Sequence, residues 1–232
     1  MKSNEEQIRK RGYIEEDELN CYRPFTKVQL LKLLQSDIAS DRTIAAKLLV
    51  EYKDIEVVKV LIAKLVTEKK LYTKIALSES IGSHGEKASK LLIEYLGKVG
   101  NNQHTSLPSK PFNKNNYPLP RDIIARTLCK IGKPAIRPLR SCLYDGDYLQ
   151  VLEAIDAIGF ISYYDDDITS LDDIIGLLHK YQEDDLMTWK LLRTLQAFKG
   201  EKVLGLLKPY TTSSVEQFRW ESARSIDQIN RR

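Results

Sequence analysis

The chain has 232 residues, with 36 Lys and Arg against 32 Asp and Glu, a formal net charge of +4 and 42% apolar residues. This composition is typical of a soluble helical protein with an apolar core. The N-terminus has no apolar stretch that would predict a secretory signal, and no segment is long and apolar enough to predict a membrane span. We therefore expect no contact with a membrane. The three cysteines lack CxxC spacing, which indicates reduced thiols in a cytoplasmic protein.

In chain order, the first segment is residues 1–24, which is charged and which we expect to be partly disordered. Amphipathic segments follow from residue 25 onward, with apolar residues at the three- and four-residue spacing of a helix. They are predicted as helices at residues 28–34, 57–66, 88–96, 135–143, 171–181 and 202–210.

Between these segments a second set of helices is predicted by self-similarity. Its members end at Tyr52, Gly82, Gly132, Gly159, Lys199 and Asn230, and three of the five intervals are close to thirty residues. An apolar column lies seven residues before each end and another one residue before it, which is one stripe of a helix. The first column is Ala45, Ile75, Ala125, Leu152, Leu192 and Ala223, and the second includes Ile81, Ile131, Ile158, Phe198 and Ile229.

Two helices per repeat of about thirty residues predict an all-α fold, an α-solenoid in which each pair buries its apolar stripe against its neighbours. The long interval between Gly82 and Gly132 contains residues 98–119, which are rich in Asn, Pro and Lys and read as an inserted loop. We therefore expect residues 25–232 to form a single elongated domain interrupted by this loop.

Two short motifs carry a resemblance to a known family. Arg42-Thr-Ile-Ala45-Ala46 and Leu128-Cys-Lys-Ile131-Gly132 are similar to the HEAT-like repeats of the phycobilin-lyase type, in which a basic residue and alanines precede a Leu-Gly-x-Ile-Gly ending. The resemblance implies about six HEAT-like helix pairs. It also implies one alternative function, an accessory subunit that acts on a cofactor-carrying protein.

Catalytic and metal sites are not predicted. Deoxyhypusine hydroxylases, which are HEAT-like enzymes, hold a di-iron centre with adjacent His-Glu pairs, but here none of the three histidines precedes a glutamate. The histidines and cysteines lack zinc-ligand spacing, and no Ser-His-Asp or Cys-His arrangement is recognisable. We expect a protein that is not an enzyme and that needs no cofactor.

Trp189 and Trp220 are 31 residues apart and occupy the same repeat column. HEAT-like alkylpurine DNA glycosylases line their binding face with aromatic and basic residues, so a nucleic-acid-binding protein is a second alternative. The tryptophan column lies three residues before an apolar one, on the predicted buried side. Packing between repeats is therefore the interpretation that we favour.

Charge is strongly segregated along the middle of the chain. Residues 98–143 carry nine basic groups against Asp122, whereas residues 144–185 carry twelve acidic groups against Lys180. One explanation is pairing between adjacent helices, with Glu153 bridging Arg126 and Arg193. The other is a charged surface that steers a partner.

The basic loop is the segment that most favours a binding role. It combines cations with aromatic residues, and loops of this length inside a domain are usually functional or disordered. We expect a binding or scaffolding solenoid that contacts an acidic protein surface through its concave face and residues 98–121, and we expect a short turn to replace the loop without loss of folding. The predicted contact residues are Lys110, Phe112, Lys114, Tyr117, Arg121, Arg126 and Lys130.

Overall fold

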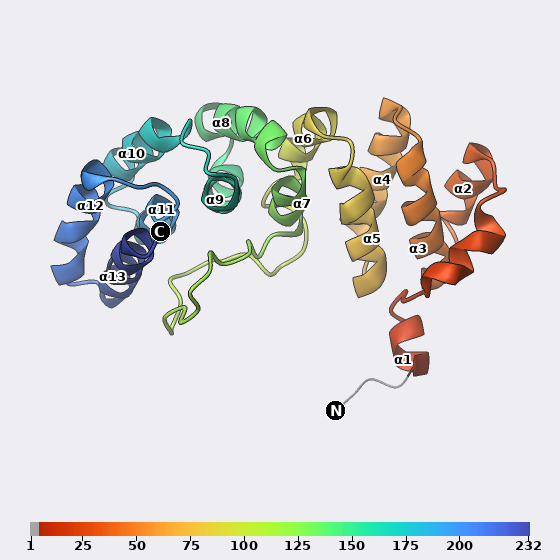
Figure 1. Cartoon of the computed structure of the whole chain (residues 1–232), viewed down its shortest axis with the longest axis horizontal. Coiled ribbons are helices and arrows are strands. Elements are labelled where there is room, and N and C mark those ends of the chain that lie inside the picture. The colour runs from red at the N-terminus through yellow and green to blue at the C-terminus, as the bar shows by residue number, and fades with distance from the viewer. Residues whose placement is uncertain (1–4) are drawn as a thin grey trace. The chain divides into compact units, whose positions relative to one another are not determined.

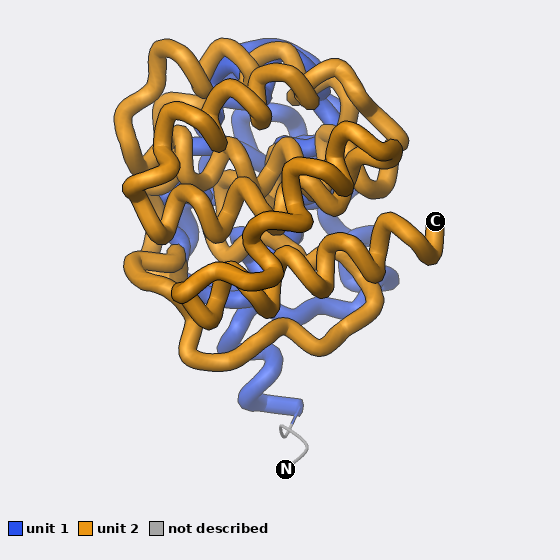
Figure 2. The backbone as a smooth tube through the Cα atoms, turned by 90° about the vertical axis from the view of Figure 1, so that its left-hand side faces the viewer, with its two compact units in different colours: residues 1–92 blue, residues 93–232 orange. Residues whose placement is uncertain are grey.

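The structure is a computed structural model that describes residues 5–232, and every regular element in this range is a helix. The chain divides into two compact units, residues 1–92 and residues 93–232 (Figure 2). The predicted fold class, an all-α solenoid built of helix pairs, is confirmed. The relation to HEAT-like repeats and the single elongated domain stay predictions.

The first unit begins with two short elements where the sequence suggested partial disorder. They are α1 (Glu5–Arg9) and the 3₁₀ helix η1 (Glu16–Tyr22), and Ile14 and Leu19 beside them are buried in a cluster with Ile44. Residues 1–4 lie outside the described part of the chain. The remaining elements are α2 (Lys27–Leu33), α3 (Ala39–Leu48), η2 (Leu49–Glu51), α4 (Ile55–Thr67), α5 (Leu71–Gly82) and α6 (Glu86–Leu92).

Within the first unit the helices pack as successive pairs. α3 packs against α2 and α5, and α4 packs against α5 and α6. The contact between α3 and α5 includes a buried hydrogen bond of 2.9 Å between the hydroxyls of Thr43 and Thr73. Arg42 and Glu68 add a buried ion pair of 2.7 Å.

The second unit contains the remaining helices and the inserted loop. It comprises η3 (Ile93–Tyr95), α7 (Ile123–Ile131), η4 (Lys133–Ala135), α8 (Ile136–Asp145), α9 (Tyr148–Asp165), α10 (Leu171–Lys180), α11 (Asp185–Leu195), α12 (Glu201–Leu207), η5 (Lys208–Thr212) and α13 (Glu216–Asn230).

The helices of the second unit form two rows. α7, α9, α11 and α13 pack side by side in chain order, and α8 and α10 pack against α9 and α11 respectively. Figure 1 shows the loop on the face of this inner row opposite α8, α10 and α12. Aspartates begin three of the inner helices, because Asp122, Asp147 and Asp184 each accept a hydrogen bond from a backbone N–H of the first turn.

The predicted apolar columns are buried in most repeats. All five residues of the column nearest the helix ends are buried, but two members of the other column are not, because Ile75 is 40% exposed and Ala223 is exposed too. In α5 the neighbouring Ala76 and Leu77 are buried in place of Ile75, and in α13 Ser222 is buried in place of Ala223. These two helices are rotated about their axes relative to the predicted stripe, which the repeat alignment does not capture.

A buried ion cluster joins α9 to α11. The side chain of Lys190 is 0% exposed, and its ammonium lies 2.8 Å from the Glu153 carboxylate and 2.9 Å from that of Asp156. It also donates to the backbone carbonyl of Leu152 at 3.0 Å. Burial raises the pKa of the Glu153 carboxyl, and the Lys190 ammonium opposes this shift.

The predicted pairing of Glu153 with Arg126 and Arg193 is therefore wrong. Arg126 donates instead to the backbone carbonyl of Pro120 at 2.5 Å, and Arg193 pairs with Glu221. Charged residues do bridge adjacent helices, but Lys190 is the cation that does so at Glu153. Lys190 could not be expected in this position from the sequence, because lysines are rarely fully buried.

No helix within residues 5–232 has the length and apolar composition that crossing a membrane would require. Likewise, no three His, Cys, Asp or Glu side chains of this range gather in a way that would hold a metal ion.

We expect the substitution Lys190→Met to lower the free energy of unfolding by about 3–5 kcal/mol, because it leaves two buried carboxylates without their cation. Urea unfolding measures this loss. Adding Glu153→Gln and Asp156→Asn removes the uncompensated charge and should restore most of the stability. The control is Lys202→Met, which breaks an exposed pair with Asp172 and should cost less than about 1 kcal/mol. Equal losses in the two single variants would contradict the assignment.

Candidate functional site

The inserted loop is fastened to the inner helices at Tyr117. This side chain is 2% exposed, and its ring centroid lies 5.5 Å from that of Tyr163 and 6.3 Å from that of Phe160. Its hydroxyl lies 3.4 Å from the hydroxyl of Thr194 on α11. Tyr117 was predicted to contact a partner, but its burial makes it an anchor of the loop.

Gly159 makes room for this anchor. It lies in the middle of α9, and a Cβ built on it would lie 2.6 Å from Cζ of Tyr117. The glycine that marked a repeat end in the sequence therefore has a steric reason to lack a side chain. Tyr117 enters the inner row where α9 presents only backbone.

A second fastening comes from α13. Arg224 donates to the backbone carbonyl of Asn116 at 2.8 Å and to that of Lys114 at 3.4 Å, and its guanidinium carbon lies 4.9 Å from the ring centroid of Phe112. Gln217 donates to the carbonyl of Pro108 at 3.2 Å. The loop is thus part of the folded unit. These contacts argue against the expectation that a short turn could replace the loop, because its removal would uncover side chains that are buried here.

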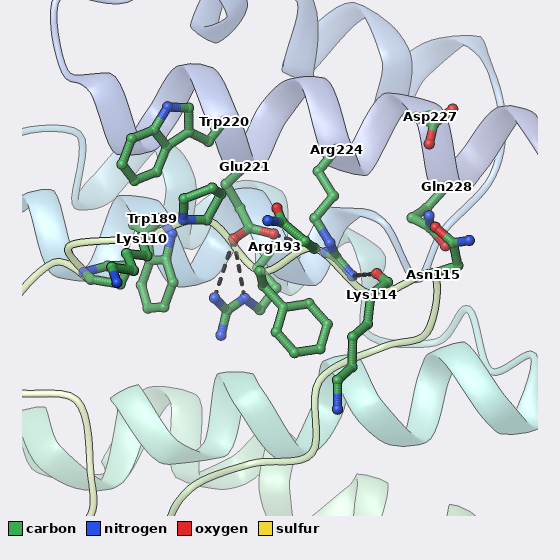
Figure 3. Close-up of a pocket in the computed structure, with 14 residues that line it drawn as sticks. Lys110, Lys114, Asn115, Trp189, Arg193, Trp220, Glu221, Arg224, Asp227 and Gln228 are labelled. Atoms are coloured by element: carbon green, nitrogen blue, oxygen red, sulfur yellow. Dashed lines mark hydrogen bonds and ion pairs between the residues drawn. The ribbon is translucent and has the colours of Figure 1, made fainter.

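The loop, α11 and α13 enclose a pocket of about 360 Å³ (Figure 3). Its floor and walls carry aromatic rings and charged groups together. The residues from the helices are Trp189, Arg193, Trp220, Glu221, Arg224, Asp227 and Gln228, and the loop supplies Pro108, Lys110, Pro111, Phe112, Asn113, Lys114 and Asn115.

Glu221 forms ion pairs with two arginines of the pocket. One of its carboxylate oxygens accepts from Arg193 at 3.2 Å, and the other accepts from Arg224 at 3.0 Å. Arg193 also stacks on the indole of Trp189, with its guanidinium carbon 3.9 Å from the ring centroid. Its nitrogens Nε and Nη2 both face Glu221, so Nη1 is left with no hydrogen bond to residues 5–232.

The two lysines of the loop complete the pocket. Lys110 and Lys114 are exposed, and neither has an ion-pair partner within residues 5–232. The described lining therefore carries four cationic side chains against Glu221 and Asp227. Its excess of positive charge lies on the loop.

The predicted contact residues do not form one surface. Lys110, Phe112 and Lys114 line the pocket, whereas Arg121 donates a hydrogen bond of 3.0 Å to the side-chain oxygen of Asn102. Arg126 supports the end of the loop through the carbonyl of Pro120, and Lys130 lies in another hollow beside Cys129 and Lys133.

Sequence reasoning missed the helical half of the pocket, although a signal for it existed. Trp189 and Trp220 are 31 residues apart, as are Arg193 and Arg224, so the two helices present the same pair of residue types. Packing was the interpretation favoured for the tryptophans. It describes Trp189, which is buried against His104 and Arg193, but Trp220 is only half-buried and lies in the pocket wall.

No protein-family model matches the sequence, and neither does any curated protein. Similar solved structures include two engineered proteins. One is 18% identical, with 88% of this chain and 96% of the other covered and a TM-score of 0.42, and the other is 16% identical, with coverages of 89% and 99% and a TM-score of 0.41. Human deoxyhypusine hydroxylase in complex with glycerol is 12% identical over 98% of this chain and 94% of its own, with a TM-score of 0.40. We draw no functional conclusion from likenesses of this degree.

We expect Gly159→Ala to destabilise the protein, although alanine favours a helix over glycine by about 1 kcal/mol. The new methyl group would displace Tyr117 and free the loop, which limited proteolysis between residues 98 and 119 would detect. Gly176→Ala is the matched control, because Gly176 lies within α10 and an added Cβ meets nothing within 4 Å. The control should be neutral or stabilised. A Gly159→Ala protein as resistant to protease as the control would contradict the anchor.

The burial of His104 leads us to expect that the stability of the fold depends on pH. The pKa of His104 is lowered to about 4, chiefly by burial; Asp156 opposes this shift, and the nearby cations Arg193, Lys190 and Arg121 add to it. Between the ordinary value near 6.5 and this value, the unfolded chain binds a proton that the folded chain does not. Stability is therefore retained above about pH 6.5 and lost as the pH falls towards 4.

Thermal unfolding from pH 7.5 to 4.5 should show a smaller loss of stability in His104→Gln than in the unsubstituted protein. Replacing the exposed His179 in the same way is the control, and it should leave the pH dependence unchanged. If His104→Gln lost stability as steeply as the unsubstituted protein, the buried neutral histidine would not contribute.

Proposed function

We propose that this protein is a non-catalytic binding module that holds an acidic segment of another protein in the pocket between the loop, α11 and α13. The observation that carries the proposal is the pair of unpaired lysines, Lys110 and Lys114, beside a pocket whose other cations are held by carboxylates or carbonyls. An exposed cation without an internal partner is available to a ligand, and it attracts anions before contact.

The acidic segment, residues 144–185, supports this proposal through its ion pairs. Several of its carboxylates pair with cations of their own unit, including Asp147 with Lys98 at 3.1 Å and Asp173 with Arg140 at 2.5 Å. Glu153 and Asp156 are buried with Lys190. Internal pairing thus accounts for much of the negative charge, and within the described part of the chain it leaves the loop lysines without ion-pair partners.

The chemistry of the pocket favours binding over catalysis. Glu221 is the carboxylate nearest its centre, and it is engaged by two arginines, which makes it a poor general base. Cys129 lies in another hollow, and burial raises the pKa of its thiol, which disfavours the reactive thiolate.

A nucleic-acid ligand is the second candidate, and one observation favours it. Trp189 and Trp220 line the same pocket as Arg193 and Lys110, and bases stack on aromatic side chains next to cations. Nucleic acids, however, present a continuous row of phosphates, and the described lining offers only Lys110 and Lys114 as cations without an ion pair. A ligand with a few negative charges fits the pocket better.

The proposal predicts that a fluorescent glutamate-rich peptide binds the protein and that its affinity falls as salt is raised, since salt screens exposed charges. The double substitution Lys110→Glu and Lys114→Glu should weaken binding by about tenfold or more, because it replaces two attractions with two repulsions. Fluorescence anisotropy over a salt series measures both effects.

Lys208→Glu is the control, because Lys208 is an exposed lysine on η5 outside the pocket lining. It should leave the affinity nearly unchanged. Duplex and single-stranded DNA form the second arm of the experiment. Tight binding of DNA together with no binding of the acidic peptide would replace the proposed function with the nucleic-acid alternative.

A further inference from the structure

The length of the pocket along α13 limits the size of the segment that it can hold. Its residues on α13 extend from Trp220 to Gln228, which is about 12 Å at a helical rise of 1.5 Å per residue. An extended chain rises about 3.3 Å per residue, so a segment of about four residues spans the pocket. The loop lies along the opposite wall, and its backbone is already held by Arg224.

The two ends of the pocket differ in chemistry. Figure 3 shows Lys110, Trp189 and Trp220 together at one end, and Asn115, Asp227 and Gln228 at the other. A carboxylate is attracted to Lys110 at the first end, whereas Asp227 at the second end is itself a carboxylate and is already paired with Arg231 at 2.9 Å. The neutral amides near Asp227 suit a peptide backbone, which needs both donors and acceptors.

Trp220 is the part of the first end that lacks a partner. It is half-buried, and no hydrogen bond or ring contact joins its indole to another side chain of residues 5–232. Trp189, by contrast, is already packed against Arg193 and His104. An aromatic side chain placed on Trp220 would bury apolar surface and gain the favourable geometry of paired rings.

We infer that the pocket selects an extended acidic segment of about four residues in which an aromatic side chain neighbours a carboxylate. The aromatic ring packs on Trp220, and the carboxylate binds Lys110 and the unbonded Nη1 of Arg193. The following residues are neutral where they pass Asp227. This inference rests on the proposed function, and it adds the identity of the anchoring side chain.

The experiment uses three seven-residue peptides, each labelled with fluorescein. The first has a central tryptophan flanked by glutamates, the second has alanine in place of the tryptophan, and the third has glutamines in place of the glutamates. We expect the first to bind at least about tenfold more tightly than either of the others, as one well-packed aromatic anchor allows.

Trp220→Ala should abolish the preference for tryptophan over alanine, whereas Tyr144→Ala, which removes an exposed aromatic residue on α8 outside the pocket, should leave it unchanged. Trp220→Leu keeps an apolar side chain in the wall and should lose most of the preference. Circular dichroism identifies any variant that does not fold, and the leucine variant serves if the alanine variant fails.

Two results separate the inference from the proposed function. Equal binding of the tryptophan and alanine peptides, with both weakened by Lys110→Glu and Lys114→Glu, would overturn the inference and leave acidic-peptide binding intact. Binding of neither acidic peptide would overturn both. A preference for tryptophan that persists in the folded Trp220 variants would place the aromatic anchor elsewhere and also overturn the inference.

Discussion

The second unit depends on ion pairs that lie inside the row of inner helices. Lys190 joins α11 to α9 through Glu153 and Asp156, and Arg193 joins α11 to α13 through Glu221. Buried ion pairs contribute little net stability, because the desolvation of each charge offsets its attraction, but a misplaced partner is costly. Their effect is to disfavour any other register of the three helices. The same register places Trp189 and Arg193 opposite α13.

The inserted loop packs against the helices of the second unit as part of its folded structure. Tyr117 occupies the space above Gly159, and Arg224 binds two carbonyls of the loop. A loop held in this way has lost its conformational freedom during folding. A ligand therefore does not have to order it, which reduces the entropic cost of binding.

The helices could be predicted from the sequence because apolar spacing is a local signal. Their ends were less well predicted, since α9 continues through the expected end at Gly159 to Asp165. The position of the loop could not, since Tyr117 meets α9 and α11 far along the chain, and nothing in its own segment distinguishes an anchor from an exposed aromatic residue. Charge pairing was predicted in kind but not in detail. Arg126 and Glu153 stand in matching repeat columns, but the structure replaces this pairing with Lys190, whose stem is long enough to reach across the interior. The rotation of α5 and α13 likewise depends on packing between helices, which a column of apolar residues does not specify.

The helices and the loop contribute different kinds of residues to the pocket. The helices supply Trp189, Arg193 and Glu221, which are tied to the interior, so their replacement would disturb the packing of the unit. The loop supplies Lys110 and Lys114, which have no ion-pair partner among residues 5–232, so their charge can change without uncovering the core. In the proposed function, the affinity for an anion would therefore depend on the loop, and α11 and α13 would set the shape that the anion must match. Arg224 binds both Glu221 and the loop backbone. It therefore holds the loop, which carries the lysines, in a fixed position relative to α13.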